Sequence, residues 1–209
     1  MSEPSELSLL PSPLLSSPPP SLLSTMAIPT MVLIGLGANL GDRRRTLERA
    51  VERIDETPGC RLVTMSKLRD TKPVLRNPGD PPVPDYFNGV AVFETTLGLR
   101  TFFDRMMAVE HELGRPPRPA TPETKKTNSA TNEGTTSPEP AWEPRTCDLD
   151  LLLFGEQVCT EPDMTIPHPR MHQRRFVLEP AMEIAPSMQH PLFNVTLEQI
   201  FHTSFPVSS

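Results

Sequence analysis

The chain has 209 residues and a formal net charge of −6, which gives no basic surface for a nucleic acid. No apolar run is long enough to cross a membrane. The three cysteines lack any paired spacing, which is typical of reduced thiols in an intracellular protein. We therefore expect a cytoplasmic protein, with a mitochondrial location as the alternative.

The start of the chain differs in composition from the rest. Residues 1–30 contain seven prolines and eight serines, and such a segment cannot bury enough apolar surface to offset the entropy of ordering. No basic residue precedes Arg43, whereas secretory signals and transit peptides carry early positive charge. We expect a disordered segment over 1–29 and one domain over 30–209. An interdomain linker in a longer chain is a second interpretation of the same composition.

The first half of the domain alternates strands and helices. The apolar run at 31–37 predicts a buried strand. Apolar residues then recur at helical spacing, which predicts an amphipathic helix over 43–57. The elements expected after it are a strand at 60–70, a proline-rich loop at 72–85, a strand at 86–95 and a helix at 97–113.

The second half begins with a long mobile insertion at about 116–141, which has almost no apolar content. The elements expected beyond it are a strand within 143–155, its short continuation at 157–160, a loop at 166–170 and helices at 171–185 and 194–202. The order β-α-β-β-α-β predicts an α+β fold of the ferredoxin-like, split βαβ type. Such a fold has a mixed, mostly antiparallel sheet with helices packed on it.

The segment EPRTCDLDLLLFG, residues 143–155, combines an apolar strand with charges at its start. Residues two apart lie on one face of a strand, so Asp148 and Asp150 point the same way while Leu149 and Leu151 face the core. Two carboxylates roughly 6–7 Å apart suit Mg²⁺, and two ions about 3.5–4 Å apart could share them. The alternative is a pair of solvated aspartates at an exposed strand end, and the D-x-D pattern alone does not decide.

Arginines near this strand favour a phosphate ligand. Arg145 precedes the aspartates by three residues, and an arginine fork matches phosphate oxygens bidentately. Phosphoryl transfer needs such a combination, because metal and arginine both stabilise developing negative charge. The other cations that could face the strand end are Arg115, Arg118, His168, Arg170, Arg174 and Arg175. Taken one at a time, each arginine is more often a solvated surface residue than a ligand. The glycines of IGLGANLGD lack the Lys-Ser/Thr pair of a P-loop.

A second group of residues could bind a planar ring. Tyr86, Phe87 and Asn88 follow the proline-rich loop, where an aromatic side chain and an amide could hold a hydrogen-bonding ring. Phe176 could supply the other face of such a site. Simple core packing is the alternative for both aromatic positions.

Five segments together resemble the 6-hydroxymethyl-7,8-dihydropterin pyrophosphokinases of folate biosynthesis. They are IGLGANLGD (34–42), DYFNGVAVFET (85–95), VEHELGR (109–115), WEPRTCDLDLLLFG (142–155) and IPHPRMHQRRFVLEP (166–180). They occur in family order over most of 31–202, and P-R-T-x-D-L-D is specific to that family. The resemblance implies a Mg²⁺-dependent diphosphotransferase. Such an enzyme passes the terminal pyrophosphate of ATP to the hydroxymethyl group of a dihydropterin and releases AMP.

The resemblance also implies roles for individual residues. Asp148 and Asp150 match the ligands of two Mg²⁺ ions, and Arg115 and Arg145 complete the catalytic set. The implied ATP-site residues are Glu110, Arg118, Trp142, Arg145, Thr165, His168 and Arg174. The implied pterin-site residues are Gly37, Thr71, Val74, Tyr86, Asn88 and Phe176. Tyr86 and Phe176 would lie on the two faces of the ring.

Three features depart from the family pattern. Glu143 stands where the family usually has glycine, the loop between Arg115 and Trp142 is longer than usual, and Arg118 is not at the common offset. A second hypothesis is therefore a catalytically weakened pterin- and ATP-binding domain of a larger multifunctional folate-pathway protein. A third is a generic metal-dependent nucleotidyltransferase. If the chain stands alone, we expect a monomer that binds small molecules and neither nucleic acid nor membrane.

Overall fold

The computed structural model describes residues 28–72, 84–114 and 146–206. Several sequence predictions fall outside these ranges. They are the disordered start, the insertion at about 116–141 and the predicted roles of Val74, Arg115, Arg118, Trp142, Glu143 and Arg145. Within the described ranges, no helix has both the length and the apolar character that crossing a membrane requires.

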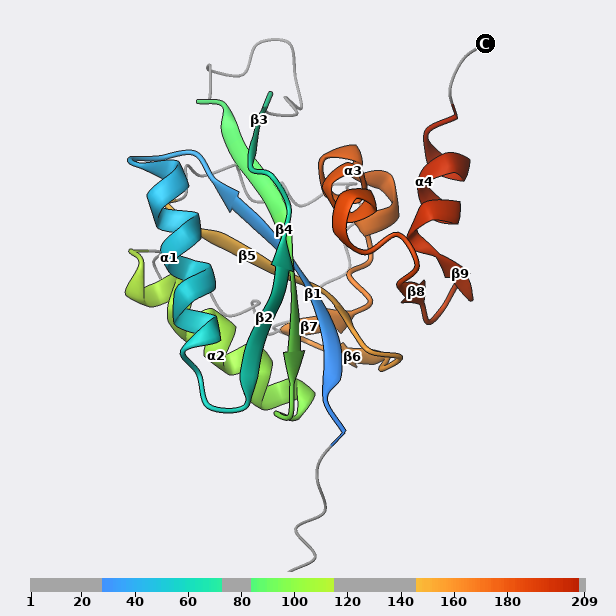
Figure 1. Ribbon diagram of the computed structural model, residues 1–209, viewed down its shortest axis with the longest axis horizontal. Helices are drawn as coiled ribbons and strands as arrows, with labels where there is room; N and C mark the ends of the chain where they lie inside the picture. The colour runs from blue at the N-terminus through green and yellow to red at the C-terminus, as the bar shows by residue number, and fades with distance from the viewer. Residues whose placement is uncertain (1–27, 73–83, 115–145, 207–209) are drawn as a thin grey trace, which may run out of the picture.

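One five-stranded sheet forms the centre of the structure (Figure 1). Its strands are β1 (Thr30–Ala38), β2 (Cys60–Met65), β3 (Arg69–Thr71), β4 (Tyr86–Thr95) and β5 (Asp148–Phe154). The order is β2-β4-β1-β5, β3 also pairs with β4, and every pair described in this sheet is antiparallel. The split arrangement follows because β4 lies between β1 and β2, which confirms the predicted ferredoxin-like α+β fold.

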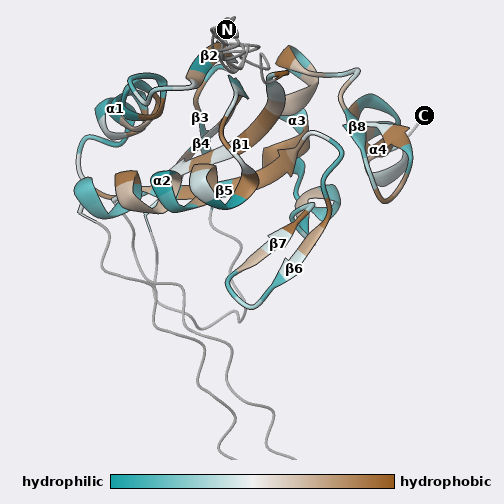
Figure 2. Ribbon diagram, turned by 90° about the horizontal axis from the view of Figure 1, so that it is seen from below, coloured by the Kyte–Doolittle hydropathy of each residue, from teal (hydrophilic) through white to brown (hydrophobic). Residues whose placement is uncertain are grey.

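Helices lie on both faces of the sheet, so the molecule has three layers (Figure 1). The helices are α1 (Arg43–Asp55), α2 (Leu99–Glu112), α3 (Arg175–Ile184) and α4 (Leu197–Ser204). Helices α1 and α2 bury the apolar stripes that the sequence predicts, against residues such as Val32, Ile34 and Phe93. Helix α3 packs on the opposite face against Leu33 and Val92, and α4 packs on α3. The central strands contain the most hydrophobic stretches (Figure 2).

The strand predicted over 60–70 is broken, which corrects the sequence prediction. Strand β2 ends at Met65 and β3 starts only at Arg69. In between, Ser66 donates its N–H to the carbonyl of Val90 at 2.9 Å, and its Oγ accepts from the N–H of Val90 at 3.0 Å. Leu68 turns into the core over Gly89, where an added Cβ would lie only 2.8 Å from the leucine. The regular ladder stops here because the Ser66 hydroxyl, rather than a backbone carbonyl, accepts the N–H of Val90.

The predicted continuation of β5 at 157–160 is also wrong. Strand β6 (Cys159–Glu161) pairs instead with β7 (Met164–Ile166), and this hairpin projects from the main sheet (Figure 2). Ile166, predicted to begin a loop, ends β7 because it and Met164 are buried in the core, and the peptide bond between Ile166 and Pro167 is cis.

Both C-terminal helices are shorter than predicted. The helix expected over 171–185 is a 3₁₀ turn, η1 (Met171–Gln173), followed by α3 from Arg175. The helix expected over 194–202 begins at Leu197, after a small hairpin of β8 (Gln189–His190) and β9 (Val195–Thr196). Thr196 and Gln199 form a capping box that fixes this start.

Candidate active site

Strand β1 brings the two predicted substrate sites next to each other. In the ladder, Gly37 pairs with Asn88 of β4 on one side and with Asp148 of β5 on the other. A Cβ added at Gly37 would lie 3.0 Å from Asn88 Oδ1 and 3.7 Å from the Cβ of Asp148. The glycine therefore leaves open the space between a predicted pterin residue and a predicted metal ligand.

The two aspartates lie as strand alternation predicts. Leu149 and Leu151 are buried in the cluster under α1 and α2, and Asp148 and Asp150 are half-exposed on the face that carries α3. No group of three or more metal-ligating side chains occurs in the described parts of the chain. Two same-side carboxylates nonetheless fit Mg²⁺, because this ion keeps several waters and takes further ligands from phosphate oxygens.

Arg174 lies against this carboxylate pair. Its Nη1 donates to Asp150 Oδ2 at 3.2 Å, and the side chains of Arg174 and Asp150 are only 19% and 28% exposed. The guanidinium also lies 5.7 Å from the centre of the Phe176 ring. Arg174 directly precedes α3, so the start of this helix places one arginine between a predicted metal ligand and a predicted pterin residue.

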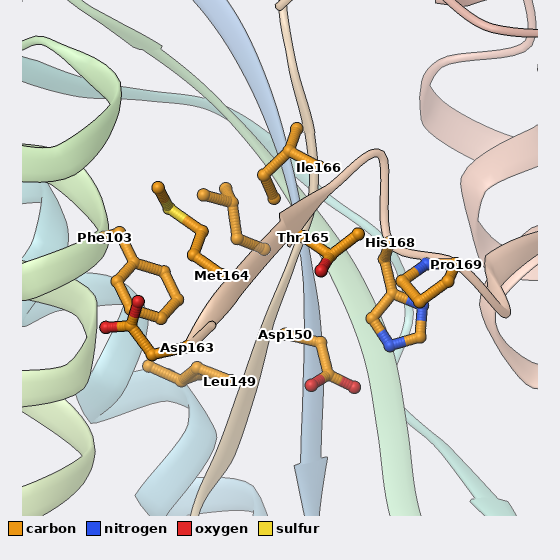
Figure 3. A pocket seen from close by; sticks show the side chains of 10 residues that line it. Phe103, Leu149, Asp150, Asp163, Met164, Thr165, Ile166, His168 and Pro169 are labelled. Atoms are coloured by element: carbon orange, nitrogen blue, oxygen red, sulfur yellow. The ribbon is translucent and has the colours of Figure 1, made fainter. Parts of the chain in front are cut away.

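A cavity of about 100 Å³ opens beside Asp150 (Figure 3). Phe103 of α2 and Leu151 of β5 line it together with Thr165 of β7 and His168. Its walls thus combine an aromatic ring and aliphatic carbon with a hydroxyl, an imidazole and a carboxylate. The structure brings Thr165, His168 and Asp150, three of the predicted ATP-site and metal-site residues, to one opening.

The position and tautomer of His168 are set by the backbone around it. Its N–H donates to the carbonyl of Leu152 at 2.9 Å, and its Nδ1 accepts from the N–H of Arg170 at 3.2 Å. The neutral ring therefore carries its proton on Nε2. Burial lowers the pKa of His168, the Asp150 carboxylate opposes that shift, and the positive charge of Arg174 adds to it.

Glu110, another predicted ATP-site residue, is not among the residues that line this cavity. It is a buried residue of α2, 2% exposed, and its carboxylate accepts the N–H of Leu149. Strand β5 is an edge of the sheet, so Glu110 satisfies a backbone donor on the strand that carries both aspartates. This contact lies on the α2 side of β5, away from the face of Asp148 and Asp150.

Three of the predicted pterin residues, Thr71, Tyr86 and Asn88, lie on β3 and β4. Asn88 Nδ2 donates to Thr71 Oγ1 at 2.5 Å, and Thr71 pairs with Tyr86 in the ladder. Tyr86 is buried, on the same face of β4 as Asn88. Phe176 is half-buried and packs with α3 on that face.

Phe103 and Asp163 are among the cavity-lining residues that sequence reasoning did not assign to the site. Phe103 reads in the sequence as one of several apolar residues on the core face of α2, and nothing distinguishes it. Asp163 also lines the cavity and forms a bidentate pair with Arg100 of α2, at 3.0 and 2.7 Å. This pair attaches the β6–β7 hairpin to α2 across 63 positions of sequence, so no local signal could reveal it.

The sequence matches a known family over this whole region. The model for 7,8-dihydro-6-hydroxymethylpterin-pyrophosphokinase (HPPK) matches residues 33–186. The chain belongs to the HPPK family. A 2-amino-4-hydroxy-6-hydroxymethyldihydropteridine pyrophosphokinase of Pseudomonas aeruginosa is 34% identical over 160 residues, covering 77% of this chain and 83% of the relative. One from Haemophilus influenzae is 32% identical, covering 80% of this chain and 89% of the relative.

Longer proteins also contain an HPPK-like part. The folic acid synthesis protein fol1 of Pneumocystis carinii is 27% identical over 81% of this chain but only 20% of its own length. Wild-type HPPK-DHPS of Plasmodium falciparum with pteroate has a TM-score of 0.57 at 11% identity, over 84% of this chain and 42% of that one. A triple mutant of the same protein gives 0.58 at 13% identity, over 87% and 45%. The structural likeness confirms the HPPK fold, and this chain spans less than half of those solved chains.

Proposed function

We propose that this HPPK-family chain transfers pyrophosphate from ATP to 6-hydroxymethyl-7,8-dihydropterin in folate biosynthesis. The products are the dihydropterin diphosphate and AMP. Family membership over 33–186 supports the reaction. Within the site, the observation that carries the proposal is the register of Gly37, which has Asn88 on one side and Asp148 on the other. An acceptor ring on one side of this glycine and a metal-bound triphosphate on the other would be in contact.

Asp148 and Asp150 would hold the magnesium. Both are half-exposed, on the face of β5 opposite to the buried Leu149 and Leu151. Two ions are expected, and they would neutralise charge on the transferred group and on the leaving phosphate. Arg145 and Arg115 keep their predicted catalytic roles at the phosphates, as do Arg118 and Trp142 in ATP binding.

The base of the nucleotide would enter the cavity between α2 and the β6–β7 hairpin. Phe103 and Leu151 offer apolar surface to a flat base, and Thr165 and His168 offer polar groups near the cavity mouth. The Nε2–H of a neutral His168 is a donor to phosphate oxygen, as is the guanidinium of Arg174 beside Asp150. Glu110 would act on this site indirectly, because it holds the backbone of β5.

The pterin would bind between β4 and α3. Asn88 donates from Nδ2 to Thr71, so its Oδ1 faces the Gly37 side and can accept an N–H of the ring. Tyr86 and Phe176 are the aromatic residues expected on the two faces of the ring, with Val74 at its edge. This orientation would present the hydroxymethyl group to the side of Asp148.

In the reaction, the hydroxymethyl oxygen attacks the β-phosphorus of ATP. A bond forms between these two atoms, the bond from the β-phosphorus to the oxygen shared with the α-phosphate breaks, and AMP leaves with that oxygen. The hydroxyl proton passes to solvent water. The protein would contribute mainly position and charge, because Arg174, the aspartates and the predicted Arg145 would act on the phosphates while Asn88 would orient the ring.

The test is incubation with ATP, Mg²⁺ and 6-hydroxymethyl-7,8-dihydropterin, followed by separation of the nucleotide products. AMP is expected in a one-to-one ratio with the diphosphorylated pterin. ADP would identify an ordinary kinase instead. No turnover together with tight binding of both substrates would identify the second candidate, a weakened binding domain of a larger folate-pathway protein. That candidate draws support from fol1 and HPPK-DHPS, in which an HPPK-like part belongs to a longer chain. A cytoplasmic, monomeric protein remains the expectation from the sequence.

A further inference from the structure

The strand that carries Thr71 has few backbone contacts. Strand β3 is only three residues long, from Arg69 to Thr71, and it pairs along one side with β4. Thr71 accepts the amide N–H of Asn88 at 2.5 Å, so the position of β3 sets the position of both side chains. Three ladder pairs leave such a strand weakly held, and other contacts must keep it in place.

Arg69 connects β3 to α3. Its guanidinium donates to the carboxylates of Glu183 and Glu179, the latter at 3.4 Å, and both glutamates belong to α3. Glu179 also accepts a hydrogen bond from Arg175, whose Nε lies 3.2 Å from Glu179 Oε2. The ion pairs therefore form a small network along one side of the helix. Helix α3 is the element that carries Phe176.

The next residue of β3 is held from the other side of the sheet. Asp70 pairs with Arg43 of α1 at 2.9 Å, and Arg43 also donates to the backbone carbonyl of Asp85 at 2.7 Å. Because side chains alternate along a strand, Arg69 and Thr71 face the α3 layer and Asp70 faces the α1 layer. Both helical layers therefore hold this short strand, and of these two residues it is Arg69 that contacts the helix of Phe176.

We propose that Arg69 is a positioning residue for the pterin site: by tying β3 to Glu183 and Glu179 of α3, it fixes the spacing between the Thr71–Asn88 pair and Phe176. This inference rests on the proposed function, because it takes these residues as the walls of the pterin site. Half-exposed ion pairs add little to global stability, so the effect is local to the site. A shift of about 1 Å in one wall weakens the hold on a rigid ring considerably.

The chain contains a matched control for this contact. Arg61 of β2 pairs with Glu94 of β4 at 2.6 Å, on the same sheet but at its other end. The side chains of Arg61 and Glu94 are 63% and 30% exposed, against 41% and 29% for Arg69 and Glu183. Arg61→Ala thus removes a similar exposed ion pair without touching β3.

The decisive measurement is the affinity for 6-hydroxymethyl-7,8-dihydropterin of the wild type, Arg69→Ala and Arg61→Ala. Arg69→Ala is expected to raise the Kd and the KM for the pterin about five- to tenfold. The kcat, the KM for ATP and the melting temperature should change little. Arg69→Lys should restore part of the affinity, and Arg69→Glu combined with Glu183→Arg should restore more than either single change. Unchanged pterin affinity in Arg69→Ala, or an equal loss in Arg61→Ala, overturns the inference.

Hydrogen exchange separates this inference from the proposed function. The amides of 69–71 are expected to exchange faster in Arg69→Ala and at the wild-type rate in Arg61→Ala. If the wild type does not bind the dihydropterin at all, the proposed function fails, and the exchange data still show whether Arg69 holds β3. Unchanged exchange at 69–71 in Arg69→Ala rejects the inference even when the wild type binds the pterin tightly.

Discussion

Arg174 and Asp150 form an ion pair at 3.2 Å, so a carboxylate expected to bind Mg²⁺ also binds an arginine. Both side chains are mostly shielded from solvent, which strengthens their interaction relative to a surface pair. An arginine in this position competes with a metal for the carboxylate and can turn to a phosphate when one arrives. Loss of Arg174 should therefore affect the binding of the metal and the binding of ATP in opposite directions.

Replacement of Arg174 by alanine should weaken the binding of ATP and strengthen the binding of the metal ion in the absence of nucleotide. We expect the KM for ATP to rise about tenfold, because a charge-assisted contact to phosphate is lost. Without nucleotide, Mn²⁺ used as a probe for Mg²⁺ should bind more tightly to Arg174→Ala than to the wild type. Paramagnetic titration measures this directly. Weaker Mn²⁺ binding in the variant would contradict competition between the arginine and the metal.

Removal of either aspartate should abolish catalysis without unfolding the protein. Asp148→Ala and Asp150→Ala are expected to lower kcat by roughly a hundredfold or more, because each removes a ligand that would hold Mg²⁺ at the transferred group. Release of AMP reports the rate, and the melting temperature checks that the fold persists. Full activity in either variant would show that the replaced aspartate is not a ligand of the metal.

A methyl group at Gly37 should damage the pterin site. Gly37→Ala would bring a Cβ to 3.0 Å from Asn88 Oδ1, closer than most real contacts, and the amide must move. We expect the KM for the dihydropterin to rise about tenfold, as for the loss of one good hydrogen bond. Gly35→Ala on the same strand is the control, because its Cβ would make ordinary contacts at 3.5 Å and beyond. An equal rise of this KM in both variants would show that the effect comes from a general disturbance of β1 and not from the contact with Asn88.

Glu110 should matter more for stability than for nucleotide contact. Glu110→Ala leaves the N–H of Leu149 without this acceptor, and we expect unfolding to become easier by about 1–3 kcal/mol. Glu110→Gln keeps an acceptor oxygen and should recover much of that loss. Urea unfolding measures the difference. If Glu110→Ala instead raises only the KM for ATP and leaves stability intact, the residue touches nucleotide directly.

Acid should loosen the C-terminal hairpin through His190. This residue is 2% exposed, its Nδ1 accepts the N–H of Phe193 at 3.3 Å, and its ring stacks on that of Phe193 at 4.1 Å. Burial lowers the pKa of His190, and the nearby His172 lowers it further. As the pH falls, His190 is therefore protonated at a higher pH in the unfolded chain than in the folded protein. The stability from neutral His190 is fully present above about pH 6.5 and falls as the pH drops towards the lowered pKa.

Thermal unfolding between pH 5 and 8 checks this pH dependence. His190→Asn keeps an acceptor for Phe193 but cannot titrate, so the part of the acid loss that comes from His190 should disappear. His202→Asn changes an exposed histidine on α4 and should leave the profile as in the wild type. Identical pH profiles for wild type and His190→Asn would show that His190 does not carry the effect.

The local sequence pattern was sufficient to predict those elements that bury one face and expose the other. The alternation of Asp148, Leu149 and Asp150 predicts which side chains leave the core, and the structure confirms it. The order of strands and helices likewise predicts a mostly antiparallel sheet, and every described pair in it is antiparallel. These features depend on periodicity and on short connections, both of which are visible in a single sequence.

Tertiary contacts decided the rest. The break after Met65 depends on Ser66 meeting Val90, and no local signal distinguishes it from a continuous strand. The contact of Arg69 with Glu183 joins residues 114 positions apart, and that of Arg100 with Asp163 joins residues 63 apart. Such pairs are set by how the layers dock, so spacing along the chain cannot reveal them.

The three-layer arrangement has a consequence for how the molecule opens. One apolar cluster joins the sheet to α1 and α2, and a second joins its other face to α3 and α4. Each cluster can act as a cooperative unit with its own opening free energy. Phe176 belongs to the second unit, whereas Leu149 and Leu151 anchor the aspartate strand in the first. A pterin and a nucleotide bound together would span both units, so each ligand should slow the amide exchange of the layer that mainly holds the other.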